Sequence, residues 1–324
     1  MTQRETWYLI LKEDQKIGIG ECAMLRSLSI DDLSDYEEKL RWVCDNISLG
    51  QEVLWEEMIH YPSIQFGIET AFLSFKSDHP AILFPSDFTK GNAGIPINGL
   101  VWMGEEHFMK QQIFEKIEQG FNCIKLKIGA IDFDSEIRLL TTIRRNFSKN
   151  QLEIRVDANG AFTLENSADR LVQLSELEVH SIEQPIAINQ HDMMSGLCKS
   201  APIAIALDEE LIGVFSLAEK QNILDKIRPQ YIILKPSLVG GIRGSQEWIT
   251  IAERLNIGWW ITSALESNIG LNAIAQWTYT LDTKHNQGLG TGSLFTNNID
   301  SPLYIEKGNL LYNPNNKWDF NLVW

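Results

Sequence analysis

The chain has 324 residues and a formal net charge of −15. This length is too great for one small domain and suits one large barrel with a smaller partner domain. A surface this negative repels phosphate backbones, and therefore no nucleic acid partner is expected. A small anionic carboxylate substrate would need cationic groups in its pocket. No apolar run approaches the ~20 residues of a membrane span, so no membrane partner is expected either.

The cysteines and the N-terminus bear on the compartment. No two of the four cysteines have the spacing of a metal-binding or redox pair: Cys22, Cys44, Cys123 and Cys198. We interpret them as reduced thiols of a cytoplasmic protein. The N-terminal residues show no basic segment followed by an apolar one, so no secretory signal is expected. The sequence leaves the oligomeric state open, with a monomer slightly favoured.

The first part of the chain predicts an α+β domain over residues 1–94. Two short strands rich in aromatic and β-branched residues are expected, over residues 6–11 and 17–22. Three segments with helical spacing of apolar residues follow, over residues 31–45, 50–60 and 63–77. A stretch rich in Gly, Asn and Pro, residues 90–96, marks the boundary.

A regular alternation of strands and helices follows over residues 95–292. Strands are predicted over 95–99, 122–128, 152–158, 180–184, 202–208, 231–235, 257–263 and, more weakly, 286–290. Helices are predicted between them, over 105–119, 133–146, 164–177, 214–221, 241–254 and 268–280. This pattern favours an α/β fold of the TIM (β/α) barrel type. A doubly wound sheet is disfavoured because no Gly-rich phosphate loop follows an early strand. The last residues, 293–324, look loop-like and are expected to return to the first domain.

Ionisable residues stand at the carboxyl ends of five consecutive predicted strands. They are Lys127, Asp157, Glu183, Asp208 and Lys235, separated by steps of 30, 26, 25 and 27 residues. Each step is about one strand–helix unit, so all five residues are expected at the same rim. In TIM barrels this rim carries the active site.

The spacing within two of these strands supports side chains that face the barrel interior. Side chains alternate along a strand, so Lys125 shares a face with Lys127. Arg155 and Asn159 likewise share the face of Asp157, and both are candidates for substrate binding or for supporting the site. Each short pattern alone has an ordinary explanation as a strand edge or a turn. Their repetition at five matching strand ends argues against coincidence.

The residue types indicate a magnesium site. Asp157, Glu183 and Asp208 offer hard carboxylate oxygens without a neighbouring His or Cys, which suits Mg²⁺, with Mn²⁺ as an alternative ion. Lysines flank these three carboxylates on both sides. A metal and lysines around a substrate carboxylate suit removal of the proton on the adjacent carbon, because they stabilise the negative charge that develops.

At these residues the sequence resembles the enolase superfamily. The patterns Lys-x-Lys, Asp-x-Asn, Glu-Gln-Pro, Asp-Glu and Lys-Pro, in this order, resemble its muconate-lactonising subgroup. The resemblance implies a modified TIM barrel with an α+β capping domain, formed here by residues 1–94. It implies Mg²⁺ held by the three carboxylates named above. It also implies that Lys127 and Lys235 lie on opposite sides of the substrate.

Within that subgroup the chain is most similar to the o-succinylbenzoate synthase family, over residues 5–23, 155–159, 262–270 and 288–295. The resemblance implies a lyase of menaquinone biosynthesis. It would catalyse syn-dehydration of 2-succinyl-6-hydroxy-2,4-cyclohexadiene-1-carboxylate to 2-succinylbenzoate through an enediolate. Lys127 would remove the α-proton and return it to the leaving hydroxide, and Lys235 would remain a cation opposite. Lys125 would tune Lys127 and contact the substrate carboxylate.

Three further residues are candidates for lining or supporting the pocket. Ser263 either hydrogen-bonds the succinyl group or caps a helix, and the sequence leaves both readings open. Glu266 is expected behind the residues that touch the substrate. Glu209 is expected as a partner of Lys235 rather than as a metal ligand.

The N-terminus departs from the pattern of the family. Relatives usually start with an extra strand and a mobile loop that carries an arginine, whereas this chain begins a few residues before Trp7. We therefore expect Mg²⁺ binding but poor turnover.

A racemase of N-succinyl amino acids, or a dipeptide epimerase, would use the same lysines. The segment 288–292 has no carboxylate for a substrate ammonium group, which disfavours the epimerase. A non-catalytic barrel is the remote alternative, disfavoured by the complete lysine and carboxylate set.

Overall fold

The computed structural model describes residues 3–129 and 131–320. Its N-terminal part, the cap, is built on a hairpin of β1 (Trp7–Glu13) and β2 (Lys16–Cys22), with Trp7 opposite Cys22. Three helices complete it: α1 (Tyr36–Asp45), α2 (Gln51–Glu57) and α3 (Pro62–Lys76). Helix α3 lies directly on β2, because a Cβ at Gly20 would stand 2.0 Å from the carbonyl oxygen of Gly67.

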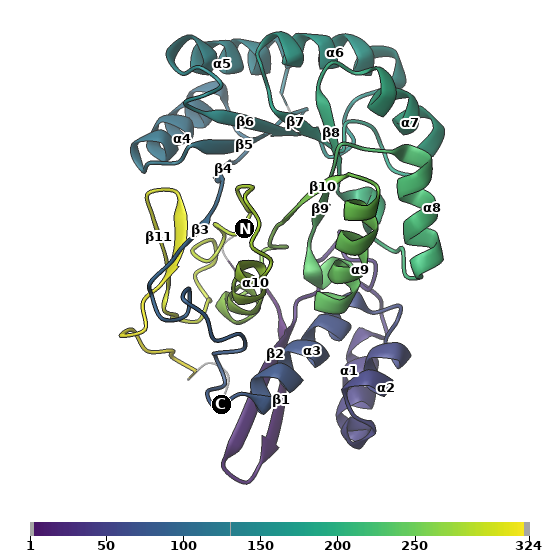
Figure 1. Cartoon of the computed structure of the whole chain (residues 1–324), viewed down its shortest axis with the longest axis vertical. Coiled ribbons are helices and arrows are strands. Elements are labelled where there is room, and N and C mark those ends of the chain that lie inside the picture. The colour runs from purple at the N-terminus through teal and green to yellow at the C-terminus, as the bar shows by residue number, and fades with distance from the viewer. Residues whose placement is uncertain (1–2, 130, 321–324) are drawn as a thin grey trace.

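The second part contains one curved parallel sheet, whose strands follow one another in chain order (Figure 1). They are β4 (Gly99–Val101), β5 (Cys123–Lys127), β6 (Glu153–Asp157), β7 (Ser181–Glu183), β8 (Ala204–Leu207), β9 (Tyr231–Leu234) and β10 (Gly258–Ile261). Isolated parallel bridges join Thr262 to Gly288 and Gln287 to Ile97, so residues 287–288 link the two edges. The predicted modified barrel is confirmed. The predicted eighth strand is present only as these bridges, since the glycines of this segment offer few side chains to pack.

Helices cover the outer face of this sheet (Figure 1). They are α4 (Glu106–Glu118), α5 (Phe133–Asn146), α6 (Leu164–Glu176), α7 (His191–Ser200), α8 (Leu217–Ile227), α9 (Gly241–Arg254) and α10 (Asn268–Thr280). The helix predicted over 214–221 is displaced, because Ser216 caps α8 in a capping box with Glu219. Helix α7 was not predicted. Its Gly and two Ser residues are poor helix formers, so its sequence pattern is weak.

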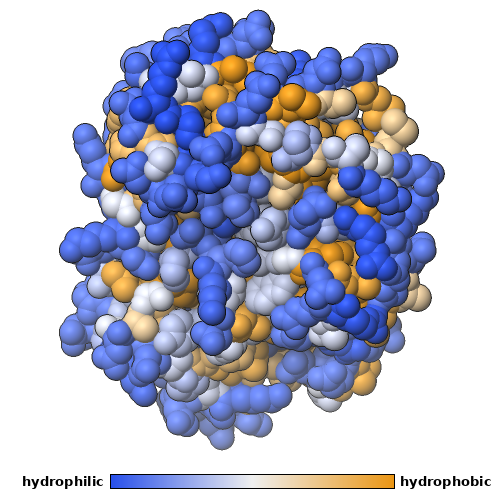
Figure 2. Space-filling model, turned by 45° about the horizontal axis from the view of Figure 1, so that its top comes forward, coloured by the Kyte–Doolittle hydropathy of each residue, from blue (hydrophilic) through white to orange (hydrophobic). Residues whose placement is uncertain are grey.

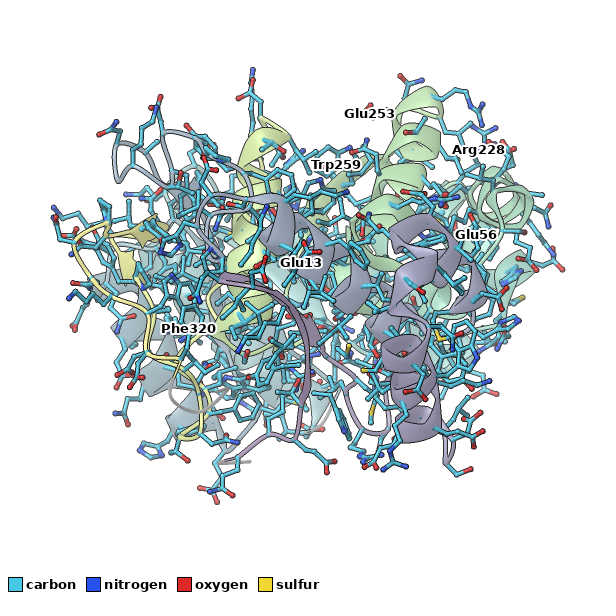
Figure 3. The ribbon with its side chains drawn as sticks, turned by 90° about the horizontal axis from the view of Figure 1, so that it is seen from below. Glu13, Glu56, Arg228, Glu253, Trp259 and Phe320 are labelled. Atoms are coloured by element: carbon cyan, nitrogen blue, oxygen red, sulfur yellow. The ribbon has the colours of Figure 1, made fainter. Side chains whose placement is uncertain are left out.

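The C-terminal residues form a hairpin, which corrects the prediction that they are loop-like. Strands β11 (Leu303–Glu306) and β12 (Asn309–Tyr312) pair, and β12 also pairs with β3 (Ile95–Pro96). The tight turn uses left-handed conformations at Lys307 and Gly308. After the hairpin, Trp318 and Phe320 pack near Ile19 of β2, and Figure 3 shows Phe320 beside the β1–β2 ribbon.

The cap is joined to the barrel through α9. The carboxylate of Glu69 on α3 accepts hydrogen bonds from the backbone N–H groups of Ile242 and Arg243, at 2.6 and 3.0 Å. The Arg243 guanidinium lies over the Trp55 ring at 4.0 Å and bonds Glu56 at 2.7 Å. Glu56 belongs to α2 and is labelled in Figure 3. The cap therefore meets the barrel through a buried carboxylate and an exposed ion pair.

The surface in Figure 2 is mostly hydrophilic, with hydrophobic side chains gathered in separate patches. Among the helices of the described residues, none combines the length and the apolar character needed to cross a membrane. The four cysteines are free thiols, and Cys44 alone of them is exposed.

Candidate active site

A cavity of about 200 Å³ opens at the carboxyl ends of the barrel strands, beneath the cap. Lys125, Lys127 and Lys235 line it. Its other walls come from both parts of the molecule: Leu25, Leu28, Asn98, Leu100, Trp102, Thr262, Ser263, Ala264, Leu265, Gly288, Gly290 and Thr291. The predicted rim therefore carries a real cavity.

Strand register brings the first three predicted residues to one level, and strand order places the other two beside them. Lys127 pairs with Asp157 across β5 and β6, and Asp157 pairs with Glu183 across β6 and β7. Asp208 directly follows β8, the next strand, and Lys235 directly follows β9. Because parallel strands end at the same edge of the sheet, these five side chains form a continuous arc.

Lys125 joins two of the carboxylates. Its ammonium nitrogen lies 2.8 Å from Asp157 Oδ2 and 2.5 Å from Glu183 Oε2. Burial alone would raise the pKa of Asp157, but the ammonium groups of Lys125 and Lys127 outweigh it and hold the pKa below its ordinary value. Burial, and then the neighbouring Asp157, raise the pKa of Glu183 well above its ordinary value. The two carboxylates thus share one buried cation.

Lys235 pairs with the third carboxylate. Its ammonium group donates to Asp208 Oδ2, and both side chains are buried. Burial alone would lower the pKa of Lys235, but Asp208 and then Glu183 outweigh it and raise the pKa above its ordinary value. Lys235 is therefore suited to remain a cation during a reaction.

Lys127 is the most accessible lysine of the arc, with a side chain that is 20% exposed. It contacts Asp157 Oδ2 at 2.7 Å and donates to Asn159 Oδ1 at 2.6 Å. The Asn159 amide in turn donates to Glu209 Oε1 at 2.7 Å. The direct ion pair of Lys235 is with Asp208, and Glu209 acts on Lys235 through its charge, which helps to raise the pKa of Lys235.

Arg155 lies deeper in the barrel, outside the cavity wall. It stands two residues before Asp157, which is roughly 6.6 Å lower along a strand. Its guanidinium bonds Glu153 at 2.7 Å and the Asn286 carbonyl at 2.9 Å, and lies over the Trp260 ring. The shared face was predicted correctly, but the depth along the strand separates Arg155 from the site.

Ser263 lines the cavity and does not cap a helix. Its hydroxyl bonds Thr291 Oγ1 at 2.7 Å and accepts from the Leu265 N–H at 2.9 Å. Ser267 caps α10 instead. Glu266 is fully buried behind the cavity and accepts from the Ser237 hydroxyl. Burial raises the pKa of this carboxyl.

Two walls of the cavity were not predicted from the sequence. Asn98, Leu100 and Trp102 stand at alternate positions in β4 and directly beside it, so the alternation that identified Lys125 and Lys127 would have found them. Leu25 and Leu28 come from the loop after β2 in the cap. Their approach depends on how the cap is seated, which no local pattern reveals.

The acidic residues suit a divalent cation by their chemistry. Asp157, Glu183 and Asp208 are buried oxygen donors on adjacent strands, and Glu183 Oε1 has no hydrogen-bond partner. Across residues 3–129 and 131–320, no three His, Cys, Asp or Glu side chains already converge as an ion-binding group. Lys125 and Lys235 form ion pairs with these carboxylates, so their ammonium groups supply the positive charge there.

Comparison with known proteins identifies the family. The family "Enolase C-terminal domain-like" matches residues 109–313, and the family "MenC, N-terminal domain" matches residues 1–75. An o-succinylbenzoate synthase of Desulfotalea psychrophila is 44% identical, over 95% of this chain and 92% of that protein. The chain belongs to the o-succinylbenzoate synthase family of the enolase superfamily. The predicted family and the predicted enzyme class, a carbon–oxygen lyase of this type, are confirmed.

The fold agrees with this family. The crystal structure of MenC from Desulfotalea psychrophila superposes with a TM-score of 0.86 at 43% identity, over 94% of each chain. An L-amino acid-D/L-Glu epimerase of Francisella philomiragia is 29% identical, over 53% of this chain and 48% of that one. In sequence, this epimerase therefore matches about half of the chain, whereas the o-succinylbenzoate synthase matches nearly all of it.

Proposed function

We propose that the chain removes water from 2-succinyl-6-hydroxy-2,4-cyclohexadiene-1-carboxylate and forms 2-succinylbenzoate, as a step of menaquinone biosynthesis. The observation that carries this proposal is the pair of lysines on opposite walls of the cavity. Lys127 ends β5 and Lys235 follows β9, and three strands separate β5 from β9 on the sheet. In a closed barrel this separation places the two side chains on opposite walls, with room for a flat ring between them.

Lys127 is proposed to carry both proton transfers. Its nitrogen takes the proton from C1, the ring carbon that bears the carboxylate, and the electron pair of that bond moves into the carboxylate. The protonated Lys127 then gives its proton to the hydroxyl on C6, which leaves as water while the ring becomes aromatic. One residue on one face of the ring makes this a syn elimination.

The other lysines stabilise the charge that develops. Lys235 stays protonated on the opposite face, as its buried pairing with Asp208 favours. Lys125 already holds two carboxylates at once and is proposed to contact the substrate carboxylate. Removing such a preorganised cation costs on the order of 3 kcal/mol of transition-state stabilisation in comparable sites.

A divalent cation is proposed to complete the site. Enzymes of the enolase superfamily use a lysine or histidine base together with Mg²⁺. Asp157, Glu183 and Asp208 are the residues proposed to hold Mg²⁺, and Mn²⁺ would suit the same oxygen donors. When bound there, the ion would offset the negative charge that develops on the substrate carboxylate. A cytoplasmic location is proposed from the free cysteines.

Replacing Lys127 tests this function. We expect Lys127→Ala to lower kcat for the cyclohexadiene substrate by at least about a thousandfold, because the variant has no group for proton transfer. Substrate loss and 2-succinylbenzoate formation would be followed with Mg²⁺ present. Lys149→Ala is the matched control, because Lys149 forms only an exposed ion pair with Glu178. A wild-type protein that forms no product, or a Lys127→Ala variant that keeps full activity, would contradict the proposal.

Racemisation of an N-succinyl amino acid is the second candidate. It is favoured by the same opposed lysines, since two bases on opposite faces can exchange a proton from either side. It differs from dehydration in needing both lysines as proton carriers. The two reactions can be distinguished by measuring exchange of the substrate α-proton in deuterium oxide. Lys235→Ala should abolish racemisation, whereas in dehydration Lys235 acts only as a cation.

A further inference from the structure

Asn98 occupies a central position in the cavity wall. It belongs to the segment between β3 and β4, and it lines the cavity together with Leu100 and Trp102 at alternate positions. Its neighbour Ile97 bridges Gln287, and Gly288 bridges Thr262 on the other side. Thr262 in turn donates its N–H to the Leu234 carbonyl, just before Lys235. Asn98 therefore lies at the barrel level of Lys235.

The side-chain amide of Asn98 lies at the cavity wall without a partner. The residue is only 5% exposed, and its side chain makes no hydrogen bond with any of the described residues. The side-chain nitrogen and oxygen of Asn98 are not among the fully buried unpaired atoms of the described residues, so they reach the space of the cavity. By contrast, the cavity hydroxyls of Ser263 and Thr291 bond each other. The amide of Asn98 is therefore available to a ligand in the cavity.

We propose that Asn98 is a specificity-determining residue that donates an amide N–H to the ketone oxygen of the substrate's succinyl group. This inference rests on the proposed function. The ketone is attached directly to the ring, on the carbon next to the one that bears the carboxylate. Asn98 lies at the level of Lys235 and immediately precedes β4, which adjoins β5, where Leu100 pairs with Lys125. The lysines that surround the ring carboxylate therefore have Asn98 beside them, where the ketone would lie.

The terminal carboxylate fits Asn98 less well. It is separated from the ketone by two further carbons and extends beyond the ring. Ser263 and Thr291 follow Thr262 and Gly288 along their segments, so they lie nearer the cavity mouth. The hydroxyl pair therefore remains the candidate for the terminal carboxylate, and Asn98 for the ketone.

A binding cycle with two ligands tests this pairing. The first ligand is 2-succinylbenzoate, and the second is 4-(2-carboxyphenyl)butanoate, in which a methylene replaces the ketone. Calorimetry would compare wild type, Asn98→Ala and Asn98→Leu, the last keeping the side-chain volume without the donor. We expect both variants to bind 2-succinylbenzoate about tenfold more weakly than wild type, the loss of one hydrogen bond. All three proteins should bind the methylene ligand within about twofold of each other.

Two outcomes would overturn the inference, and both are distinct from failure of the proposed function. Equal weakening of both ligands would show that Asn98 supports the wall rather than the ketone. Unchanged binding of 2-succinylbenzoate would show that the amide makes no contact. In either case wild type would still convert the cyclohexadiene substrate, whereas a wild type without turnover would refute the function itself. Turnover should show the same dependence, with KM raised about tenfold in Asn98→Ala and kcat changed less.

Discussion

At the scale of single residues, two glycines of the cavity wall differ in what they tolerate. A Cβ added at Gly288 would stand 1.5 Å from Thr262 Oγ1, whereas the nearest atom to a Cβ at Gly290 is 3.4 Å away. We expect Gly288→Ala to lower kcat/KM by about tenfold or more, because Thr262 must move and it lines the cavity. Gly290→Ala should stay within about twofold. Steady-state kinetics of the two variants, with thermal melting as a folding check, measures this difference, and equal effects would contradict it.

The candidate residues also show how far residue types alone determine chemistry. Lys127, Asp157, Glu183, Asp208 and Lys235 were all identified from strand-end spacing, and the structure gathers them in one arc. Their pairing was not predictable, because it depends on which ammonium group reaches which carboxylate. The direct ion pair of Lys235 is with Asp208 and not with Glu209. This choice depends on side-chain directions at the start of a short turn.

At the scale of elements, one arginine ties the two halves of the cavity wall together. Arg4 donates to the Ala264 carbonyl of the barrel at 2.9 Å and to the Ala23 carbonyl of the cap at 2.8 Å. Leu25 and Leu265, the cavity residues next to these points, come from the two loops that Arg4 joins. The guanidinium is suited to this bridge because its donors diverge in a fixed plane.

Replacing Arg4 should therefore act on substrate binding more than on chemistry. We expect Arg4→Ala to raise KM about fivefold to tenfold with a smaller change in kcat, and Arg4→Lys to restore only part of the loss. Arg26→Ala is the matched control. Arg26 lies on the cap loop that Arg4 contacts, but its own contacts are exposed ion pairs with Glu5 and Asp32 and the Trp7 ring. A fall in kcat without a change in KM would contradict a positioning role for Arg4.

At the scale of the whole molecule, a buried carboxyl group between cap and barrel makes the stability of the protein depend on pH. Burial raises the pKa of Glu69 from 4.5 to about 8, although two backbone N–H groups of α9 partly offset it. Between these values the folded protein holds a proton that the unfolded chain has lost. The free energy of unfolding therefore falls as pH rises from 4.5 to about 8, by at most about 1.4 kcal/mol per pH unit.

Glu69→Gln should remove this slope. Relative to wild type, the variant is expected to become steadily more stable as pH rises from 5 toward about 8. This trend does not depend on how the free energies of unfolding of the two proteins differ at pH 5. Urea unfolding at several pH values measures the difference between the two proteins. Glu253→Gln on α9 is the control, because Glu253 is exposed (Figure 3). A difference between wild type and Glu69→Gln that does not vary with pH would contradict the assignment.

Much of this protein is determined by sequence alone. The alternation of apolar strands and amphipathic helices specifies a barrel, because each strand must be buried and each helix must cover it. The period of two along a strand then fixes which side chains face inward, and the strand ends fix the rim. The acidic and basic members of the site follow from these local rules without any knowledge of the fold's details.

The tertiary structure decided what depends on distant segments meeting. The closure of the barrel through residues 287–288, the hairpin of β11 and β12 on β3, and the cap wall of Leu25 and Leu28 all join parts far apart in the chain. Arg155 illustrates the same limit, since periodicity gives a side chain's face but not its depth in the barrel. Local sequence encodes direction and period, whereas the shape of the cavity depends on packing between elements.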